Sequence, residues 1–150
     1  MSLARGLKNK NPLNMRYNIN IPWQGQVGQD GNGYAVFDTM ENGLRAAARD
    51  IRNLQKNSNV KTIRDLITKW APPKGNFKDA SGAVKTETNP TDNYIAYVSR
   101  QLNVNPDSPV DWVNNDVILS RIITAMVQNE NGVNPIPGDS IMAAIQRAKT

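Results

Sequence analysis

The spacing of apolar residues changes near Met40 in this 150-residue chain. Before that point the sequence is rich in Asn, Gln and Gly, and few apolar residues stand at helical spacing. After it, apolar residues recur every three or four positions, which indicates amphipathic helices that must pack together. Helices are predicted at residues 41–56, 63–70, 89–102 and 118–127, and from about residue 139 onward.

Local signals mark several of the predicted helix ends. Thr62 followed three residues later by Asp65 resembles a capping box, which predicts the start of the 63–70 helix. The Pro-Pro pair at 72–73 is predicted to end the same helix. Asn89 is predicted to cap the next helix, with Pro90 in its first turn.

The first forty residues instead suggest strands. Residues 17–21 alternate like a short strand, residues 29–33 form a strong turn signal, and residues 34–37 give a second strand. Residues 74–88 are polar and irregular, and we expect an exposed loop there. The prediction is a single domain over residues 1–150, mainly α (α+β), with a small N-terminal β-hairpin.

Histidine and cysteine are both absent, whereas glutamate occurs three times. A Ser-His-Asp triad, a Cys-His pair, a histidine zinc site and a disulfide are therefore excluded. If the protein is an enzyme, carboxylates must transfer the protons, and we expect no cofactor and no metal. Glu130, at the end of the most apolar predicted helix, is the leading candidate.

The chain carries 18 basic and 13 acidic residues, for a formal charge of +5. The charge suits either a solvated basic surface or an anionic partner such as a cell-wall polymer. The basic residues are scattered, and no nucleic-acid motif appears, so no nucleic acid is expected as a partner. The hypothesis of a packaging protein that binds nucleic acid would rest on net charge alone. No apolar run reaches the length of a membrane span, and no signal peptide is expected.

Three segments of the chain stand out as motifs: Arg5-Gly6-Leu7-Lys8-Asn9-Lys10-Asn11-Pro12-Leu13-Asn14-Met15-Arg16, Trp70-Ala71-Pro72-Pro73 and Asn89-Pro90-Thr91-Asp92-Asn93-Tyr94-Ile95. Together they resemble a family of small phage and prophage virion proteins. The family opening is Arg-Gly-x-x-Asn-x-Asn-Pro-Gly-Asn-Ile-Arg, and the resemblance extends over about residues 5–135. Leu13 replaces the usual glycine, and residues 74–86 look inserted.

Glu87-Thr88 with Tyr94-Ile95 is similar to a late Glu-Thr-x-x-Tyr-Val segment of lytic transglycosylases. Residues 126–135, which include Glu130, are similar to the catalytic Ile-x-x-Glu-Ser-x-Phe-Asn-Pro helix end of these enzymes. The virion proteins thus resemble in turn the lysozyme-like superfamily, which includes lytic transglycosylases and glucosaminidases. In transglycosylases the catalytic helix comes first, whereas here it comes last. The resemblance thus implies a circular permutation, which neighbouring chain ends make physically tolerable.

The resemblance also implies roles for particular residues. Glu130 would be the catalytic acid, because a carboxyl in apolar surroundings has the raised pKa that protonates a glycosidic oxygen. A transglycosylase needs only this glutamate, whereas a lysozyme uses a second carboxylate. By position the candidates for that second carboxylate are Glu87, Asp30 and Asp38. The residues expected to bind sugar are Asn11, Asn14, Trp70 and Tyr94.

Each of these residues also has a purely structural interpretation. Glu130 would then be a polar helix end before Gly132, and the asparagines would form turns. Trp70 and Tyr94 stand at helical spacing and would belong to the core. The motif Glu-Asn-Gly occurs twice, at Glu41 and at Glu130, so it is not specific by itself.

The function that these patterns favour is a phage-associated glycosidase of the lytic transglycosylase or muramidase type, which cleaves peptidoglycan glycan strands. It would act at the bacterial cell wall, from a virion or a prophage, with other virion proteins as further partners. The alternative is a non-catalytic structural virion protein that binds glycan with the same fold.

Overall fold

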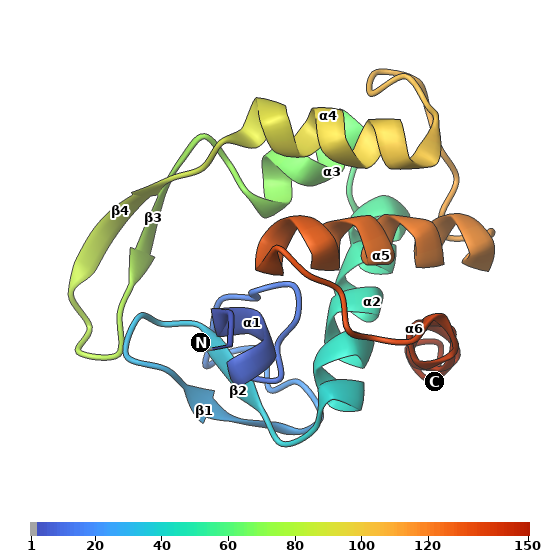
Figure 1. Cartoon of the computed structure of the whole chain (residues 1–150). Coiled ribbons are helices and arrows are strands. Elements are labelled where there is room, and N and C mark those ends of the chain that lie inside the picture. The colour runs from blue at the N-terminus through green and yellow to red at the C-terminus, as the bar shows by residue number, and fades with distance from the viewer. Residues whose placement is uncertain (1–2) are drawn as a thin grey trace.

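Six helices and two separate β-hairpins make up residues 3–150, the part of the chain that this computed structural model describes (Figure 1). Met1 and Ser2, which the predicted domain includes, lie outside the described residues. In chain order the elements are α1 (Arg5–Lys8), β1 (Gln26–Gln29), β2 (Ala35–Phe37), α2 (Met40–Asn57), α3 (Ile63–Trp70), β3 (Lys74–Lys78), β4 (Val84–Thr88), α4 (Thr91–Leu102), α5 (Asp116–Asn131) and α6 (Gly138–Arg147). The predicted mainly helical α+β class is confirmed.

The core forms where the apolar faces of the helices meet. α5 lies between α4 and α6, and α2 packs against α6 (Figure 1). Trp112, in the loop before α5, is fully buried and donates its indole N–H to the Ile51 carbonyl at 2.9 Å. Fully buried side chains from the helices are Leu44, Ile51, Ile63, Leu66, Ile67, Leu119, Ile122, Ile123 and Met126. None of the helices within residues 3–150 combines the length and the hydropathy that a membrane span requires.

Two of the predicted helix ends are confirmed and one is wrong. Thr62 and Asp65 form the expected capping box, and Gly132 ends α5 in the left-handed conformation, with φ +75°. The Asn89 cap is wrong, because Pro90 occupies the N-cap position of α4. The Asn89 amide instead donates a 2.8 Å hydrogen bond to the Pro72 carbonyl, so it ties the start of α4 to the end of α3.

The predicted N-terminal hairpin exists, but its first strand is not at residues 17–21. Those residues form turns, and Ile19 is 78 % exposed, so the alternation has no buried face. The strand that pairs antiparallel with β2 is β1, from Gln26 to Gln29. Only an isolated bridge between Arg16 and Tyr34 extends this pairing towards the predicted segment.

Residues 74–88, predicted as a loop, form the second antiparallel hairpin, β3–β4. Gly75, Phe77 and Glu87 are the only half-buried residues of its two strands, so the segment has no apolar pattern that would reveal a strand. The hairpin arches away from α3 and α4, and its tip meets the β1–β2 turn (Figure 1). There the Ala80 amide donates to the Gly31 carbonyl at 3.2 Å.

Candidate functional site

Glu130 is the second-last residue of α5, and its carboxyl is held from two sides. Asn14 Nδ2 donates to Oε1 at 3.1 Å, and the Tyr94 hydroxyl donates to Oε2 at 2.9 Å. Asn14 comes from the loop after α1, whereas Tyr94 is a buried residue of α4. The two donors fix the carboxyl at the junction of the N-terminal segment and the helical core.

The surroundings of Glu130 favour its neutral form. Burial raises the pKa of its carboxyl above the ordinary value, and the nearby negative charge of Glu87 acts in the same direction. The hydrogen bonds from Asn14 and Tyr94, and the charge of Arg5, offset only part of this effect. A carboxyl of this kind keeps its proton to higher pH, which is the property a general acid needs.

The loop that carries Asn14 is built by Asn11. The Asn11 side chain is fully buried and donates to the carbonyls of Met15 and Ala35, both at 2.9 Å, while it accepts from the Met15 amide. This turn lets Asn14 adopt a left-handed backbone with φ +52°. The hydrogen bonds of Asn11 thus all go to backbone, which favours the turn-forming interpretation of this residue.

Asn131 joins the same loop to the end of α5. Its amide nitrogen donates to the Pro12 carbonyl at 2.8 Å and to the Val127 carbonyl at 2.9 Å. The residue after the candidate acid therefore fastens the N-terminal segment against the helix, next to the contact between Asn14 and Glu130.

Glu87 lies on β4 in an ion pair with Arg16 and also accepts a 3.2 Å hydrogen bond from the Tyr34 hydroxyl. The Arg16 guanidinium lies 3.8 Å from the centroid of the Tyr34 ring and 3.5 Å from that of Phe77. Such cation–π contacts hold the guanidinium plane in place. Arg16 thus connects the β3–β4 hairpin to the N-terminal segment.

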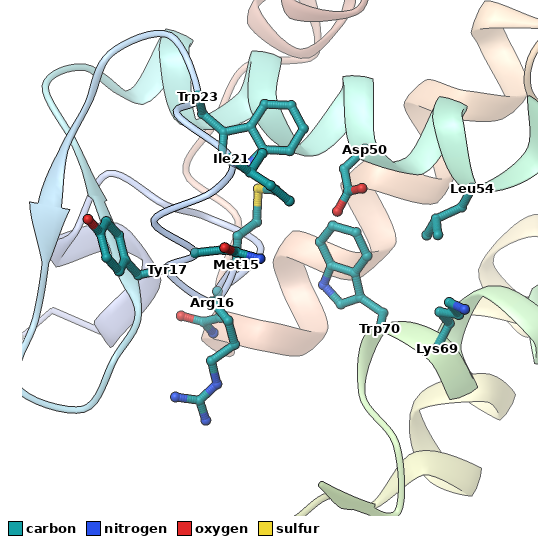
Figure 2. Close-up of a pocket in the computed structure, with 11 residues that line it drawn as sticks. Met15, Arg16, Tyr17, Ile21, Trp23, Asp50, Leu54, Lys69 and Trp70 are labelled. Atoms are coloured by element: carbon teal, nitrogen blue, oxygen red, sulfur yellow. The ribbon is translucent and has the colours of Figure 1, made fainter. Parts of the chain in front are cut away.

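A cavity of about 380 Å³ opens between the N-terminal segment, α2 and the end of α3, and neither Glu130 nor Glu87 is among its lining residues (Figure 2). Asn14, which binds Glu130, and Arg16, which binds Glu87, both line it. Trp70 also lines the cavity, and its indole N–H donates to the Leu13 carbonyl at 3.0 Å. The complete lining is Asn14, Met15, Arg16, Tyr17, Asn18, Ile21, Trp23, Asp50, Leu54, Lys69 and Trp70.

The other carboxylates considered from the sequence have structural partners. For Asp30, burial acts to raise the pKa, but hydrogen bonds from the Tyr34 amide and the Asn9 side chain lower it below the ordinary value. A hydrogen bond from the Asn42 side chain is the main cause that lowers the pKa of Asp38. Both groups hold turns in their ionised form. Among the described residues, no group of three or more acidic, His or Cys side chains could hold a metal ion.

Comparison with known proteins places this chain among phage proteins. No family model matches it. Protein P5 of Pseudoalteromonas phage PM2 is 32 % identical to it over 141 residues, which are 92 % of this chain and 78 % of Protein P5. The chain belongs to the Protein P5 family. The predicted phage origin is therefore confirmed, whereas the lysozyme-like resemblance and peptidoglycan as the substrate stay predictions.

Three residues that line the cavity, Arg16, Trp23 and Asp50, are not among the site residues predicted from the sequence. Arg16 stands in the opening motif, but nothing in the sequence indicates its partner Glu87, 71 residues away. Trp23 lies in a segment without secondary structure. Asp50 could have been noticed, because it follows Ala47 by three residues and precedes Leu54 by four, at the edge of the apolar face of α2.

Proposed function

We propose that this phage protein cleaves the glycan strands of peptidoglycan, as a lytic transglycosylase or muramidase with a lysozyme-like fold. The observation that carries the proposal is the half-buried Glu130 carboxyl, whose pKa is raised by burial and which is oriented by Asn14 and Tyr94. It lies one hydrogen bond from a residue that lines a cavity with two tryptophans. A protein of this kind, carried in a virion or encoded by a prophage, would open the cell wall locally.

Glycosidic cleavage requires a proton on the leaving oxygen as the bond breaks. A neutral Glu130 would donate that proton, and its pKa, raised by burial, keeps a larger share of the carboxyl protonated near neutral pH. The resulting carboxylate would then accept a proton from the attacking hydroxyl group. The donors Asn14 and Tyr94 would stabilise the carboxylate during this interval.

The partners of Glu87 favour the single-glutamate route. Its carboxylate is engaged by Arg16 and by the Tyr34 hydroxyl, so attack on a sugar carbon would require it to leave both. Its negative charge nevertheless raises the pKa of Glu130. We therefore assign Glu87 an electrostatic role, and we favour the transglycosylase reaction, in which a hydroxyl of the sugar attacks and an anhydro product forms.

The test is lysis of purified peptidoglycan by the wild type and by Glu130→Gln, followed as turbidity loss. We expect the substitution to lower the rate at least 100-fold, because the amide cannot donate the proton. The matched control is Glu41→Gln, which changes the other Glu-Asn-Gly motif at an exposed position in the first turn of α2. Mass spectrometry of the products distinguishes anhydro ends from reducing ends.

Two results would contradict the proposal in different ways. Equal lysis by wild type and Glu130→Gln would reject Glu130 as the acid. Absence of lysis by the wild type, together with binding to intact peptidoglycan, would instead support the non-catalytic virion protein with the same fold.

A further inference from the structure

Asp50 is an acidic residue without a partner on the wall of the cavity. It extends from α2, and neither a salt bridge nor a side-chain hydrogen bond joins it to another residue within 3–150. Burial is what raises the pKa of its carboxyl above the ordinary value. A carboxyl that is partly withdrawn from water and left unpaired destabilises the fold, so a bound ligand is a natural partner for it.

Aromatic side chains surround this carboxyl. In Figure 2 the Asp50 carboxyl points toward the indole of Trp70 at the end of α3, while Trp23 enters the cavity from the N-terminal segment. Both tryptophans are only half-buried, unlike Trp112, which is fully buried in the core. Exposed aromatic faces next to one hydrogen-bonding group are typical of a site for a ligand with an apolar face and a polar edge.

We propose that this cavity is a subsite for one N-acetylhexosamine unit of a glycan strand. Trp23 and Trp70 contact the C–H faces of the sugar, and Asp50 accepts hydrogen bonds from a ring hydroxyl or from the acetamido N–H. The inference rests on the proposed function, because it takes peptidoglycan glycan as the ligand. A volume of about 380 Å³ lies within the usual range for small-ligand sites.

The position of the cavity explains how a strand bound there would reach the acid. Asn14 lines the cavity with one part of its surface and donates to Glu130 with its amide. Arg16 lines it as well and holds Glu87. A sugar in the subsite would therefore contact the two side chains that hold the carboxylates, and the following sugar unit of the strand would extend past Asn14 toward Glu130.

The binding test uses tri-N-acetylchitotriose and the Glu130→Gln variant, in which turnover cannot complicate the titration. Binding is followed by tryptophan fluorescence and by calorimetry, since two of the three tryptophans line the cavity. We expect Asp50→Asn and Trp23→Ala, each introduced into this variant, to raise Kd about tenfold or more through loss of the acceptor charge and of the ring contact. The control substitution is Glu41→Gln, also on α2 and outside the cavity lining.

Asp50→Asn keeps the shape of the side chain and removes a half-buried, unpaired ionisable group, so this variant should fold. A melting temperature at or above that of the parent at pH 7 verifies this before binding is compared. If Trp23→Ala has a lower melting temperature than the parent, only the chitotriose affinity of Asp50→Asn is used to test the subsite.

The outcomes separate this inference from the proposed function. Wild-type lysis with unchanged chitotriose affinity in Asp50→Asn overturns the subsite and leaves the catalytic proposal standing. Absence of lysis, with chitotriose binding that Asp50→Asn and Trp23→Ala weaken, supports the subsite and rejects catalysis. Tighter binding of the unacetylated glucosamine trimer, abolished by Asp50→Asn, would show that the site selects a cation and would overturn the N-acetyl assignment.

Discussion

At the scale of single residues, the carboxyl groups of Glu130 and Asp50 share a cost to stability. Burial raises the pKa of both, which means that the folded protein disfavours their ionised forms relative to the unfolded chain. Proteins retain such groups where activity depends on them, and other parts of the fold compensate. Asn14 binds Glu130 and lines the same cavity as Asp50, so the two destabilising acids belong to one region of the molecule, as expected of a functional site.

Substituting Glu130 by Gln should therefore stabilise the protein at neutral pH. The folded pKa of Glu130 lies above the unfolded value, so the wild type is most stable below that value and loses stability as pH rises through the folded pKa. Glutamine does not titrate, so its advantage should be present at pH 7 and vanish below about pH 4.5. Urea unfolding at pH 4 and pH 7 measures this difference, and an advantage of the same size at both pH values would contradict it. Glu41→Gln, at an exposed position, is the control.

Removing the Tyr94 hydroxyl group, which donates a hydrogen bond to Glu130, should raise the pKa of Glu130 further. The hydrogen bond from Tyr94 is one of the causes that lower the pKa of this carboxyl, so Tyr94→Phe leaves its charge less stabilised. Carbon-13 NMR of the carboxyl groups is suited to the measurement, because the chain has only three glutamates. The alkaline limb of the pH–activity profile should move in the same direction.

The control for this prediction is Tyr97→Phe, one helical turn further along α4. Tyr97 is half-buried and is not among the residues that donate to Glu130. A Glu130 titration that stays the same in Tyr94→Phe and in Tyr97→Phe would mean that the Tyr94 hydroxyl does not stabilise the carboxylate.

The two Glu-Asn-Gly motifs show why residue roles could not be assigned from the motif alone. Gly43 lies inside α2, where it packs closely on the Lys10 carbonyl, and Glu41 is exposed. Gly132 instead ends α5 with a positive φ and open space around it, which leaves Glu130 in the last turn. The Glu-Asn-Gly motif thus allows close packing at Gly43 and ends a helix at Gly132, because the residues around the two copies differ.

At the scale of elements, the five helices from α2 to α6 could be predicted, whereas the short helix α1 and most of the strands could not. Helices α2 to α6 each bury one face, so the periodicity of their apolar residues reveals them. The strands lie at the surface, and β1, β3 and β4 are without a fully buried residue, so alternation carries no information about them. Their pairing depends on turns and on contacts between the two hairpins.

The contact between the two hairpins can be tested at Gly33. This residue has φ +87°, and a Cβ added to it would clash with the backbone carbonyl of Lys78 in the other hairpin. Gly33→Ala should destabilise the protein by more than about 1 kcal/mol, because both the backbone strain and the clash oppose it. Gly31→Ala is the matched control in the same turn, since an added Cβ there meets no atom within 4 Å.

Urea unfolding and amide exchange measure this effect. In Gly33→Ala we expect faster exchange at the Ala80 amide, which donates to the Gly31 carbonyl across the two hairpins. Equal stability of the Gly33 and Gly31 variants would show that the hairpins are not held together in solution.

At the scale of the whole molecule, the candidate site is assembled from segments that are far apart in the sequence. Asn14 and Glu130 are separated by 116 positions, and Tyr94 and Glu130 by 36. The sequence motifs named all three residues, but no periodicity or spacing could indicate that they meet. The loop around Asn11 and the end of α5 bring them together, so the site depends on how the N-terminal segment docks on the helical core.

That docking can be disturbed at Gly6, a residue that does not contact Glu130. A Cβ added to Gly6 would lie 2.5 Å from Asn131 Oδ1 and 2.8 Å from the Asn11 carbonyl, so α1 or its loop would have to move. We expect Gly6→Ala to lower the free energy of unfolding by about 1–3 kcal/mol, as overpacking typically does. Peptidoglycan lysis should fall as well under conditions where the variant is still folded, because Asn14 would shift relative to Glu130.

Gly138→Ala is the control for this prediction, because Gly138 opens α6 and an added Cβ there meets no atom within 4 Å. Urea unfolding gives the stability of both variants, and turbidity loss measured well below their unfolding transitions gives the activity. A Gly6→Ala variant with the stability and the lysis rate of the wild type would contradict the close packing of α1 against Asn131 at the end of α5. If it lost stability but kept its full lysis rate, the position of Asn14 would be irrelevant to the reaction, and Glu130 would have to act without this donor.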